Sequence, residues 1–174
     1  MPLPTAVEYR DAISTPRGAF PTDLALQTGE PVPDSLGMPK GVSGNFATVF
    51  SVNSGHRRFA VKCFTRAVPN QHDRYRAIEA ALSSVSGSWR VGFSFIDRGI
   101  RVNGSVYPIL KMDWVEGVSL LRFVEAHRAD PEALRRVAEE ILRCARDLDD
   151  RGLGHGDLQH GNVLLVPMPG GAFA

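Results

Sequence analysis

The sequence predicts an α+β fold in which a β-rich first half is followed by a mainly helical second half. Between Gly41 and Trp114, short apolar runs alternate with turn residues, which is typical of antiparallel strands. After Asp130 the apolar residues recur every three or four positions instead, as in an amphipathic helix. The hydrophobic fraction of 43% in 174 residues is enough to bury a substantial core.

The first 64 residues contain a proline-rich segment followed by two predicted strands. Residues 1–40 are rich in proline, and only 7–13 and 24–26 offer apolar anchors. We therefore expect an extended N-terminal arm with about one helical turn. The segments 46–52 and 58–64 are predicted strands, and the Asn-Ser-Gly sequence between them favours a hairpin.

One helix and two or three strands are predicted next. Apolar residues recur at helical spacing in one stretch, at Tyr75, Ile78, Leu82 and Val85. Gly87 follows as a stop signal. Residues 91–97 and 107–114 are predicted strands joined through an Asn-Gly turn, and a further strand is expected around 98–102.

The second half begins with a clear helix signal. Asp130 is a favourable N-cap and Pro131 suits the first helical position, so a long helix is predicted from there to Gly152. Residues 119–128 predict a shorter helix, and 163–166 a short apolar strand.

Charge and hydropathy exclude several classes of function. The formal net charge is +1 with acids and bases interspersed, which argues against a partner recognised mainly by charge, such as nucleic acid or an anionic membrane. No stretch approaches the roughly 20 apolar residues that span a bilayer, and the N-terminus does not resemble a secretory signal. Cys63 and Cys144 are far apart and have no motif around them, so we expect a reducing, cytoplasmic setting.

Three features that carry chemistry occur in order along the chain. A glycine-containing turn spans Gly41 to Val49, and such turns let backbone N–H groups approach phosphate. Lys62 alternates with apolar residues in the next strand, and Glu79 in the predicted helix is a candidate partner for its ammonium. Taken singly, these features are also explained by an ordinary hairpin turn, a solvated lysine and an exposed helix acid.

The third feature is the segment HGDLQHGN, residues 155–162. Its glycines permit unusual backbone angles, and a predicted strand follows it. Asp157 could accept a proton from an attacking hydroxyl, and Asn162 could offer its carbonyl oxygen to magnesium. A lone acid in such a loop also has a turn-capping explanation.

Together these residues resemble the protein-kinase-like superfamily, over roughly residues 40–166. That family orders a glycine-rich loop, Ala-x-Lys, a helix Glu, a hinge and H-R-D-L-x-x-x-x-N. The chain has Gly41–Val49, Ala60-Val-Lys62, Glu79, the segment LKMDWVEGVSL at 110–120 and HGDLQHGN. More narrowly, the segments YRDAI, SGNFATVF, YPILKMDWVEG and HGDLQHGN resemble a bacterial group of serine/threonine protein kinases.

The resemblance implies a role for each matching residue. For ATP the implied residues are Gly41 and Gly44 over the phosphates, Val49 and Ala60 around the adenine, Lys62 on the α- and β-phosphates, Glu79 orienting Lys62, Met112 as gatekeeper, Asp113 and Val115 in the hinge, and Ser119 near the ribose. Asp157 would be the catalytic base, and Asn162 would be a ligand of Mg²⁺.

Several positions depart from the family pattern. Val42 and Ala47 replace glycines of the usual loop, which weakens the phosphate-cradle argument. Gly156 replaces the arginine of H-R-D, which suggests that control does not run through a phosphorylated activation loop. Gln159 replaces a lysine that many protein kinases have. His-Gly-Asp followed by Gly-Asn is also the form found in aminoglycoside and other small-molecule phosphotransferases.

The resemblance implies a kinase N-lobe with an antiparallel sheet and one helix, and a hinge, over residues 41–117. A partial, mainly helical C-lobe would occupy 118–174. The expected function is ATP-dependent phosphotransfer of serine/threonine protein kinase type, onto a protein. The alternatives are a small-molecule kinase and a non-catalytic pseudokinase or nucleotide-binding scaffold.

The C-terminal end of the sequence sets a further expectation. No acid follows Asn162, so the magnesium-binding aspartate of the family has no counterpart. We therefore expect an N-terminal fragment of a longer kinase that is inactive alone; the alternative is a natural short form that acts as a binding module. An incompletely covered 131–151 helix would make it marginally stable or prone to self-association.

Overall fold

The computed structural model describes residues 2–83, 87, 89–154 and 158–167. It divides the chain into two units, which we describe separately. The first comprises Met1–Ser86 with Val91–Trp114, and the second comprises Gly87–Arg90 with Val115–Ala174. Helices and antiparallel strands occur in both, so the fold belongs to the α+β class that the sequence predicts.

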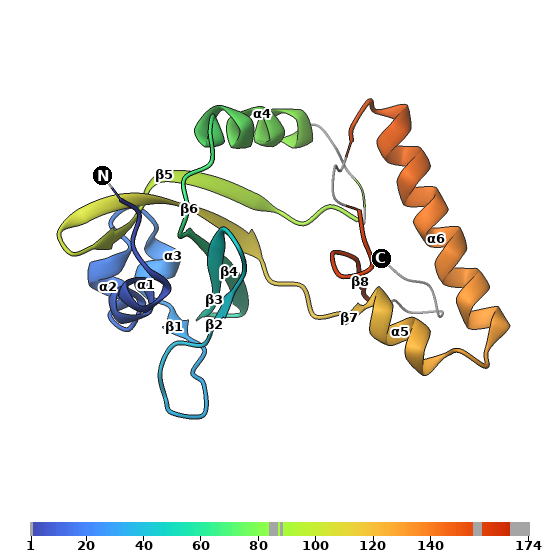
Figure 1. Cartoon of the computed structure of the whole chain (residues 1–174), viewed down its shortest axis with the longest axis horizontal. Coiled ribbons are helices and arrows are strands. Elements are labelled where there is room, and N and C mark those ends of the chain that lie inside the picture. The colour runs from blue at the N-terminus through green and yellow to red at the C-terminus, as the bar shows by residue number, and fades with distance from the viewer. Residues whose placement is uncertain (1, 84–86, 88, 155–157, 168–174) are drawn as a thin grey trace. The chain divides into compact units, whose positions relative to one another are not determined.

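The first unit is built around a six-stranded antiparallel sheet (Figure 1). Its strands are ordered β1-β3-β4-β6-β5, and β2 also pairs with β3. The strands are β1 (Glu30–Pro31), β2 (Gly41–Ser43), β3 (Ala47–Ser54), β4 (Arg57–Phe64), β5 (Phe93–Val102) and β6 (Ser105–Asp113). The helices are α1 (Ala6–Ile13), α2 (Pro16–Ala19), α3 (Leu24–Gln27) and α4 (Gln71–Ser83).

Two tight turns set the register of the sheet. Gly55 has a φ of 59° in the turn between β3 and β4. Asn103 and Gly104 have φ values of 49° and 82° between β5 and β6, and consecutive positive φ angles are the signature of a type I′ hairpin. The predicted hairpins are therefore confirmed. The two strands expected over 91–102 form a single strand, β5, with an irregularity between Ile96 and Ile100.

The expectation of an extended arm over residues 1–40 is wrong. This segment contains three helices, and it buries four large side chains completely: Tyr9, Ile13, Phe20 and Leu26. They join one core cluster with Phe50, Val52, Phe59 and Val61 of the sheet. Each such side chain contributes roughly 1.5–3 kcal/mol on burial, so these helices form part of the core of the first unit.

Helix α4 packs on the other face of the same sheet. In Figure 1 the N-terminal helices (blue) lie on one side of β5 and β6, and α4 (green) lies on the opposite side. Tyr75 of α4 stacks on Phe95 of β5, with ring centroids 5.4 Å apart, and lies 5.8 Å from the ring of Phe64. Burial raises the pKa of the Tyr75 phenol. This aromatic cluster positions the predicted helix against the sheet.

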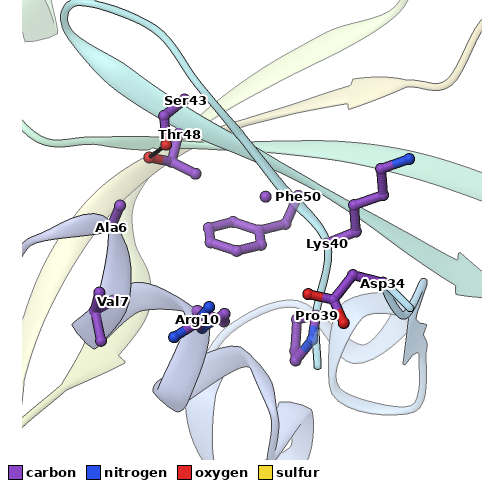
Figure 2. Close-up of a pocket in the computed structure, with 10 residues that line it drawn as sticks. Ala6, Val7, Arg10, Asp34, Pro39, Lys40, Ser43, Thr48 and Phe50 are labelled. Atoms are coloured by element: carbon purple, nitrogen blue, oxygen red, sulfur yellow. Dashed lines mark hydrogen bonds between the residues drawn. The ribbon is translucent and has the colours of Figure 1, made fainter. Parts of the chain in front are cut away.

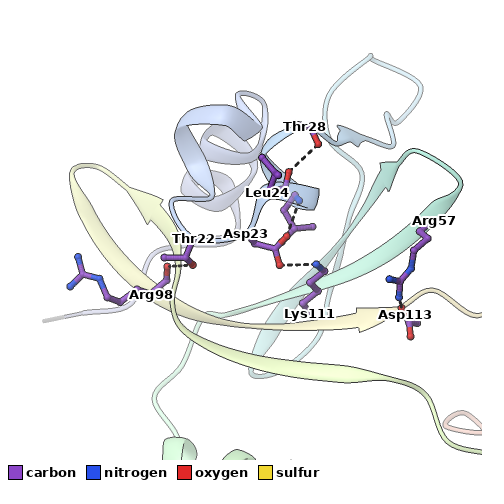
Figure 3. A network of polar contacts seen from close by, with 9 residues as sticks. Thr22, Asp23, Leu24, Thr28, Arg57, Arg98, Lys111 and Asp113 are labelled. Atoms are coloured by element: carbon purple, nitrogen blue, oxygen red, sulfur yellow. Dashed lines mark hydrogen bonds and ion pairs between the residues drawn. The ribbon is translucent and has the colours of Figure 1, made fainter.

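Polar contacts also attach the N-terminal segment to the sheet (Figure 3). The Asp23 carboxylate forms an ion pair with Lys111 Nζ of β6 at 2.7 Å, and the two side chains are only 14% and 17% exposed. The same carboxylate accepts a hydrogen bond from the Leu26 N–H at 3.0 Å and so caps α3. Thr22 donates through Oγ1 to the carbonyl of Arg98 at 3.2 Å. Asp23 thus connects a short helix to the sheet.

The second unit combines a small ladder with two helices. Its elements are β7 (Val118–Ser119), α5 (Leu120–Ala126), α6 (Pro131–Asp150) and β8 (Leu164–Leu165), and β7 pairs with β8. Asp130 accepts a hydrogen bond from the Ala133 N–H at 3.0 Å and caps α6. Gly152 has a φ of 64° just beyond that helix, so both predicted ends of α6 are confirmed.

The core of the second unit is small. Phe123, Ala133, Val137 and Leu165 form its buried cluster. Leu142, also on α6, remains 55% exposed. Within the described ranges, no helix is both long enough and apolar enough to span a membrane.

Candidate functional site

Four of the residues assigned to nucleotide binding share one face of the first unit's sheet. Val49 of β3 lies directly opposite Lys62 of β4, and Ala60 of β4 lies opposite Met112 of β6. Directly paired residues point to the same face, as do residues two apart in one strand. The register therefore brings Val49, Ala60, Lys62 and Met112 together as neighbours.

Lys62 occupies an apolar position between two partner strands. Its cross-strand neighbours are Val49 and Leu110, and its side chain is partly buried. Among the residues that the structure describes, Lys62 has no acid within 4.0 Å. A partly buried lysine without a counter-ion is less favourable than a paired one, which makes this position suited to an anionic ligand.

The expected pair between Lys62 and Glu79 is not formed. Glu79 is partly buried on α4, and Tyr75 of the same helix packs on the Lys62 face of the sheet. However, no ion pair within 4.0 Å joins the two side chains in the described part of the chain. The helix and the lysine are thus on the same face, but the contact that would orient the ammonium is absent in this conformation.

The glycine-containing turn forms the connection of the β2–β3 hairpin. Gly41 pairs with Phe50, and a Cβ at Gly41 would lie 2.8 Å from the Phe50 ring and 2.9 Å from Thr48 Cγ2. Both of those side chains point away from the Lys62 face, so packing accounts for the glycine at position 41. Gly44 donates its N–H to the carbonyl of Ala47 at 2.8 Å. That donor is therefore already used within the turn.

The predicted hinge begins at the end of β6. Met112 packs against the buried cluster of Ala47, Phe64 and Leu110. Asp113 forms an ion pair with Arg57 Nη2 at 2.6 Å and donates its N–H to the carbonyl of Gly92 at 2.8 Å. Any adenine contact at Asp113 would therefore use its carbonyl oxygen. No sequence signal pointed to Arg57 as the partner of Asp113.

The remaining candidates belong to the second unit. Ser119 is the N-cap of α5, and its hydroxyl accepts from the Arg122 N–H at 3.4 Å, so this side chain already has a local structural role. Asn162 is exposed and donates its N–H to the carbonyl of Gln159 at 2.8 Å. Val115 is partly buried.

The loop that carries Asn162 leads into an ordered ladder. Ser119 of β7 lies opposite Leu164 of β8, and the Leu120 N–H donates to the carbonyl of Val163 at 3.0 Å. The predicted catalytic base, Asp157, lies outside the described residues. In the described ranges, no group of three or more His, Cys, Asp or Glu side chains could hold a metal ion.

Trp114 lies next to the predicted hinge, and no sequence motif assigns it a role. Its indole Nε1 is buried and has no hydrogen-bond acceptor within the described structure. The guanidinium carbon of Arg58 lies 4.1 Å from the centroid of its ring, in a cation–π contact. A buried donor without a partner costs about 1–3 kcal/mol, so Trp114 is an energetically unfavourable feature beside the candidate site.

No protein-family model matches the sequence, and no significant match to a curated protein is found.

Proposed function

We propose that the chain contributes the nucleotide-binding part of an ATP-dependent phosphotransferase of serine/threonine protein kinase type, within a protein-kinase-like fold. One observation carries the proposal. Lys62 is partly buried, has no acidic partner within the described residues, and lies on one sheet face with Val49, Ala60 and Met112. That arrangement combines a cation for phosphate with a small apolar surface for a purine.

The sequence motifs give each part of the proposed site a role. The ammonium of Lys62 would bind the α- and β-phosphates, and Val49 and Ala60 would contact the adenine. Met112 would close the apolar end of this surface, and the carbonyl of Asp113 would accept a hydrogen bond from the exocyclic amine of adenine. A shift of α4 that brings Glu79 to Lys62 would then fix the ammonium in place.

The transfer step is assigned to the HGDLQHGN loop. Asp157 would accept the proton of the attacking hydroxyl, and the amide oxygen of Asn162 is of the kind that magnesium prefers. Bound magnesium would neutralise charge on the phosphates. In the described part of this loop, Gln159 and Asn162 are the side chains that carry an amide oxygen.

A nucleotide-binding scaffold without phosphotransfer is the second candidate function. The specific observation in its favour is the unformed contact between Lys62 and Glu79. In a protein kinase both members of this pair must be in place for efficient transfer. The scaffold function needs only the affinity for nucleotide, so binding and turnover have to be measured separately.

Titration calorimetry with ATP, with and without Mg²⁺, tests the binding part of the proposal. Lys62→Met should weaken binding about tenfold or more, because a charge-assisted contact to phosphate is lost. Lys40→Met is the matched control. Lys40 is exposed and directly precedes β2, so its removal should leave the affinity for ATP unchanged. No binding of ATP at millimolar concentration, or equal affinity in wild type and Lys62→Met, would rule the site out.

Labelled ATP then distinguishes three outcomes: transfer to a protein, transfer to a small molecule, and binding without transfer. Transfer to protein substrates that is abolished by Asp157→Asn supports a protein kinase. Transfer only to small hydroxylated acceptors supports a small-molecule kinase. Nucleotide binding without any transfer supports the scaffold.

A further inference from the structure

Helix α4 is attached to its sheet more weakly than α1 is attached on the opposite face. None of the 13 residues of α4, all of them described, is buried, whereas the eight-residue α1 buries Tyr9 and Ile13 completely. Figure 2 shows α1 beside Phe50, which joins those two side chains in one core cluster. A helix with few buried apolar contacts moves at a low cost in free energy. Polar contacts therefore have a large share in setting the position of α4.

Asp97 of β5 makes two such contacts with α4. Its Oδ1 lies 3.0 Å from His72 Nε2, and its Oδ2 lies 3.3 Å from Arg76 Nη2. We call this pair of contacts the Asp97 latch. Phe95, two residues before Asp97, stacks on Tyr75 of α4 with ring centroids 5.4 Å apart. Residues two apart in a strand face the same way, so Phe95 and Asp97 form one surface of β5 on which α4 lies.

His72 makes the latch sensitive to protonation. Its Nε2 faces Asp97 of β5, and its Nδ1 faces Asp73 of α4 at 3.1 Å. Neutral imidazole has one N–H and can donate to only one of the two carboxylates, whereas imidazolium donates to both. Arg76 is the nearby cation, and it keeps its charge at physiological pH. The pKa of His72 is raised, mainly by its hydrogen bond to Asp73, while Arg76 opposes this rise.

Glu79 lies on the same side of α4 as the residues of the latch. His72, Arg76 and Glu79 follow one another at the four- and three-residue spacing of neighbours on one helix face. Any rotation or sliding of α4 that brings Glu79 to Lys62 therefore also moves His72 and Arg76 relative to Asp97. In the described part of the chain the latch is formed, and no ion pair within 4.0 Å joins Glu79 to Lys62.

We propose that the Asp97 latch regulates the nucleotide site by holding α4 in a position in which Glu79 does not reach Lys62. Loss of the proton from His72 weakens the latch, lets α4 move Glu79 to Lys62, and so strengthens the binding of nucleotide phosphates. This inference rests on the proposed nucleotide-binding function. The side chains of Asp97 and His72 are 43% and 48% exposed, so we expect an effect of about threefold, as is typical of solvent-exposed ion pairs.

Titration calorimetry with ATP and Mg²⁺ tests the latch through a double-variant comparison. Asp97→Asn should strengthen ATP binding about threefold below the pKa of His72. Arg74→Gln is the control, because Arg74 is exposed on α4 and forms no ion pair within the described residues. The gain must vanish when Asp97→Asn is made in a Glu79→Gln background, since the latch acts through Glu79. An Asp97→Asn variant with wild-type affinity, or the same gain without Glu79, would overturn the proposal.

The pH dependence tests the role of His72 separately. Between about pH 5.5 and 8, ATP affinity should rise about threefold more in the wild type than in His72→Gln. Comparing the two proteins cancels the protonation of ATP itself. His56→Gln removes an exposed histidine in the β3–β4 turn and should behave as the wild type does. The same rise in His72→Gln as in the wild type would refute the part assigned to this proton.

Hydrogen exchange without nucleotide distinguishes a failed latch from a failed nucleotide site. At equal pH, amides of α4 should exchange about threefold faster in Asp97→Asn than in the wild type, and those of β3 and β4 should not change. This result together with no ATP binding would support the hold of Asp97 on α4 and refute the nucleotide site. Unchanged exchange in α4 would overturn the latch whether or not ATP binds.

Discussion

Removing one member of the ion pair between Asp23 and Lys111 should strongly destabilise the first unit, because the other charge is then left partly buried without a partner. Asp23→Ala removes two contacts at once: the cap on the Leu26 N–H and the partner of the Lys111 ammonium. Loss of an N-cap costs about 1 kcal/mol. Stranding one member of a buried ion pair costs about 3–5 kcal/mol, and the exposures of 14% and 17% favour the lower end. The expected total is about 4 kcal/mol.

Three further variants separate these contributions. Asp23→Asn keeps a good N-cap but removes the charge, so it should cost about 3 kcal/mol. Lys111→Met removes the ammonium that would be stranded, although it also removes the cation–π contact with Phe59 at 4.2 Å. The double variant of Asp23→Asn with Lys111→Met should therefore recover most of the loss, to within about 1 kcal/mol of the wild type.

Urea unfolding followed by the fluorescence of Trp114 measures these differences for the first unit. A Trp89→Phe background removes the other tryptophan of the chain, which belongs to the second unit. If Asp23→Ala costs less than about 1 kcal/mol, or if the double variant is no more stable than Asp23→Asn alone, the pair does not stabilise the first unit in this way.

Three other properties follow from the described contacts. The pKa of His72 is raised above 6.5, mainly by its hydrogen bond to Asp73. Protonated His72 therefore stabilises the fold below pH 6.5, and this contribution is lost as the pH rises through the raised pKa. The urea midpoint should fall over that pH interval in the wild type and change less in His72→Gln, and parallel curves for the two proteins would contradict this. Trp114→Phe removes a buried indole N–H without an acceptor in the described structure, so calorimetry should find Tm within about 4 °C of the wild type, whereas a larger drop would mean that the N–H is satisfied. Burial raises the pKa of the Cys63 thiol, so peptide mass spectrometry should find iodoacetamide on Cys144 in the folded protein and on Cys63 only after unfolding; rapid native labelling of Cys63 would disagree.

The elements that the sequence predicted well are those whose signal is local. Asp130 and Gly152 mark the two ends of α6 by capping chemistry, and the apolar runs of β3 and β4 lie on either side of a glycine turn. These signals depend on residues close together in the chain. They can therefore be recognised from the sequence, without knowing which surface each element packs against.

The N-terminal helices were missed because their stabilising contacts are distant in sequence. Tyr9 donates its hydroxyl to the carbonyl of Phe64 at 2.9 Å, and Asp23 reaches Lys111. The high proline content of the segment concealed the helices. One local signal was available: Thr5 and Glu8 form a capping box, in which each side chain bonds the other's backbone N–H.

The candidate site was predictable only in part for the same reason. Alternation along β4 places Ala60 and Lys62 on one face from sequence alone. The pairing of Ala60 with Met112 needs the register between β4 and β6, which no local pattern sets. The distance from Lys62 to Glu79 depends on how α4 packs through Tyr75, and the helical periodicity does not determine that.

The two faces of the sheet differ in whether their lysine has partners within the fold, and this difference bears on where an anionic ligand would bind. Lys111, on the face covered by α1–α3, has both an acid and an aromatic ring as partners, so its charge is compensated within the fold. Lys62, one strand away on the opposite face, has neither within the described residues, although it is partly buried between Val49 and Leu110. Packing alone would favour an apolar residue there, because an uncompensated ammonium lowers stability. Lys111 is therefore compensated within the fold, whereas Lys62 lowers the stability of the fold while it has no partner. An external anion, such as a nucleotide phosphate, would offset that loss of stability.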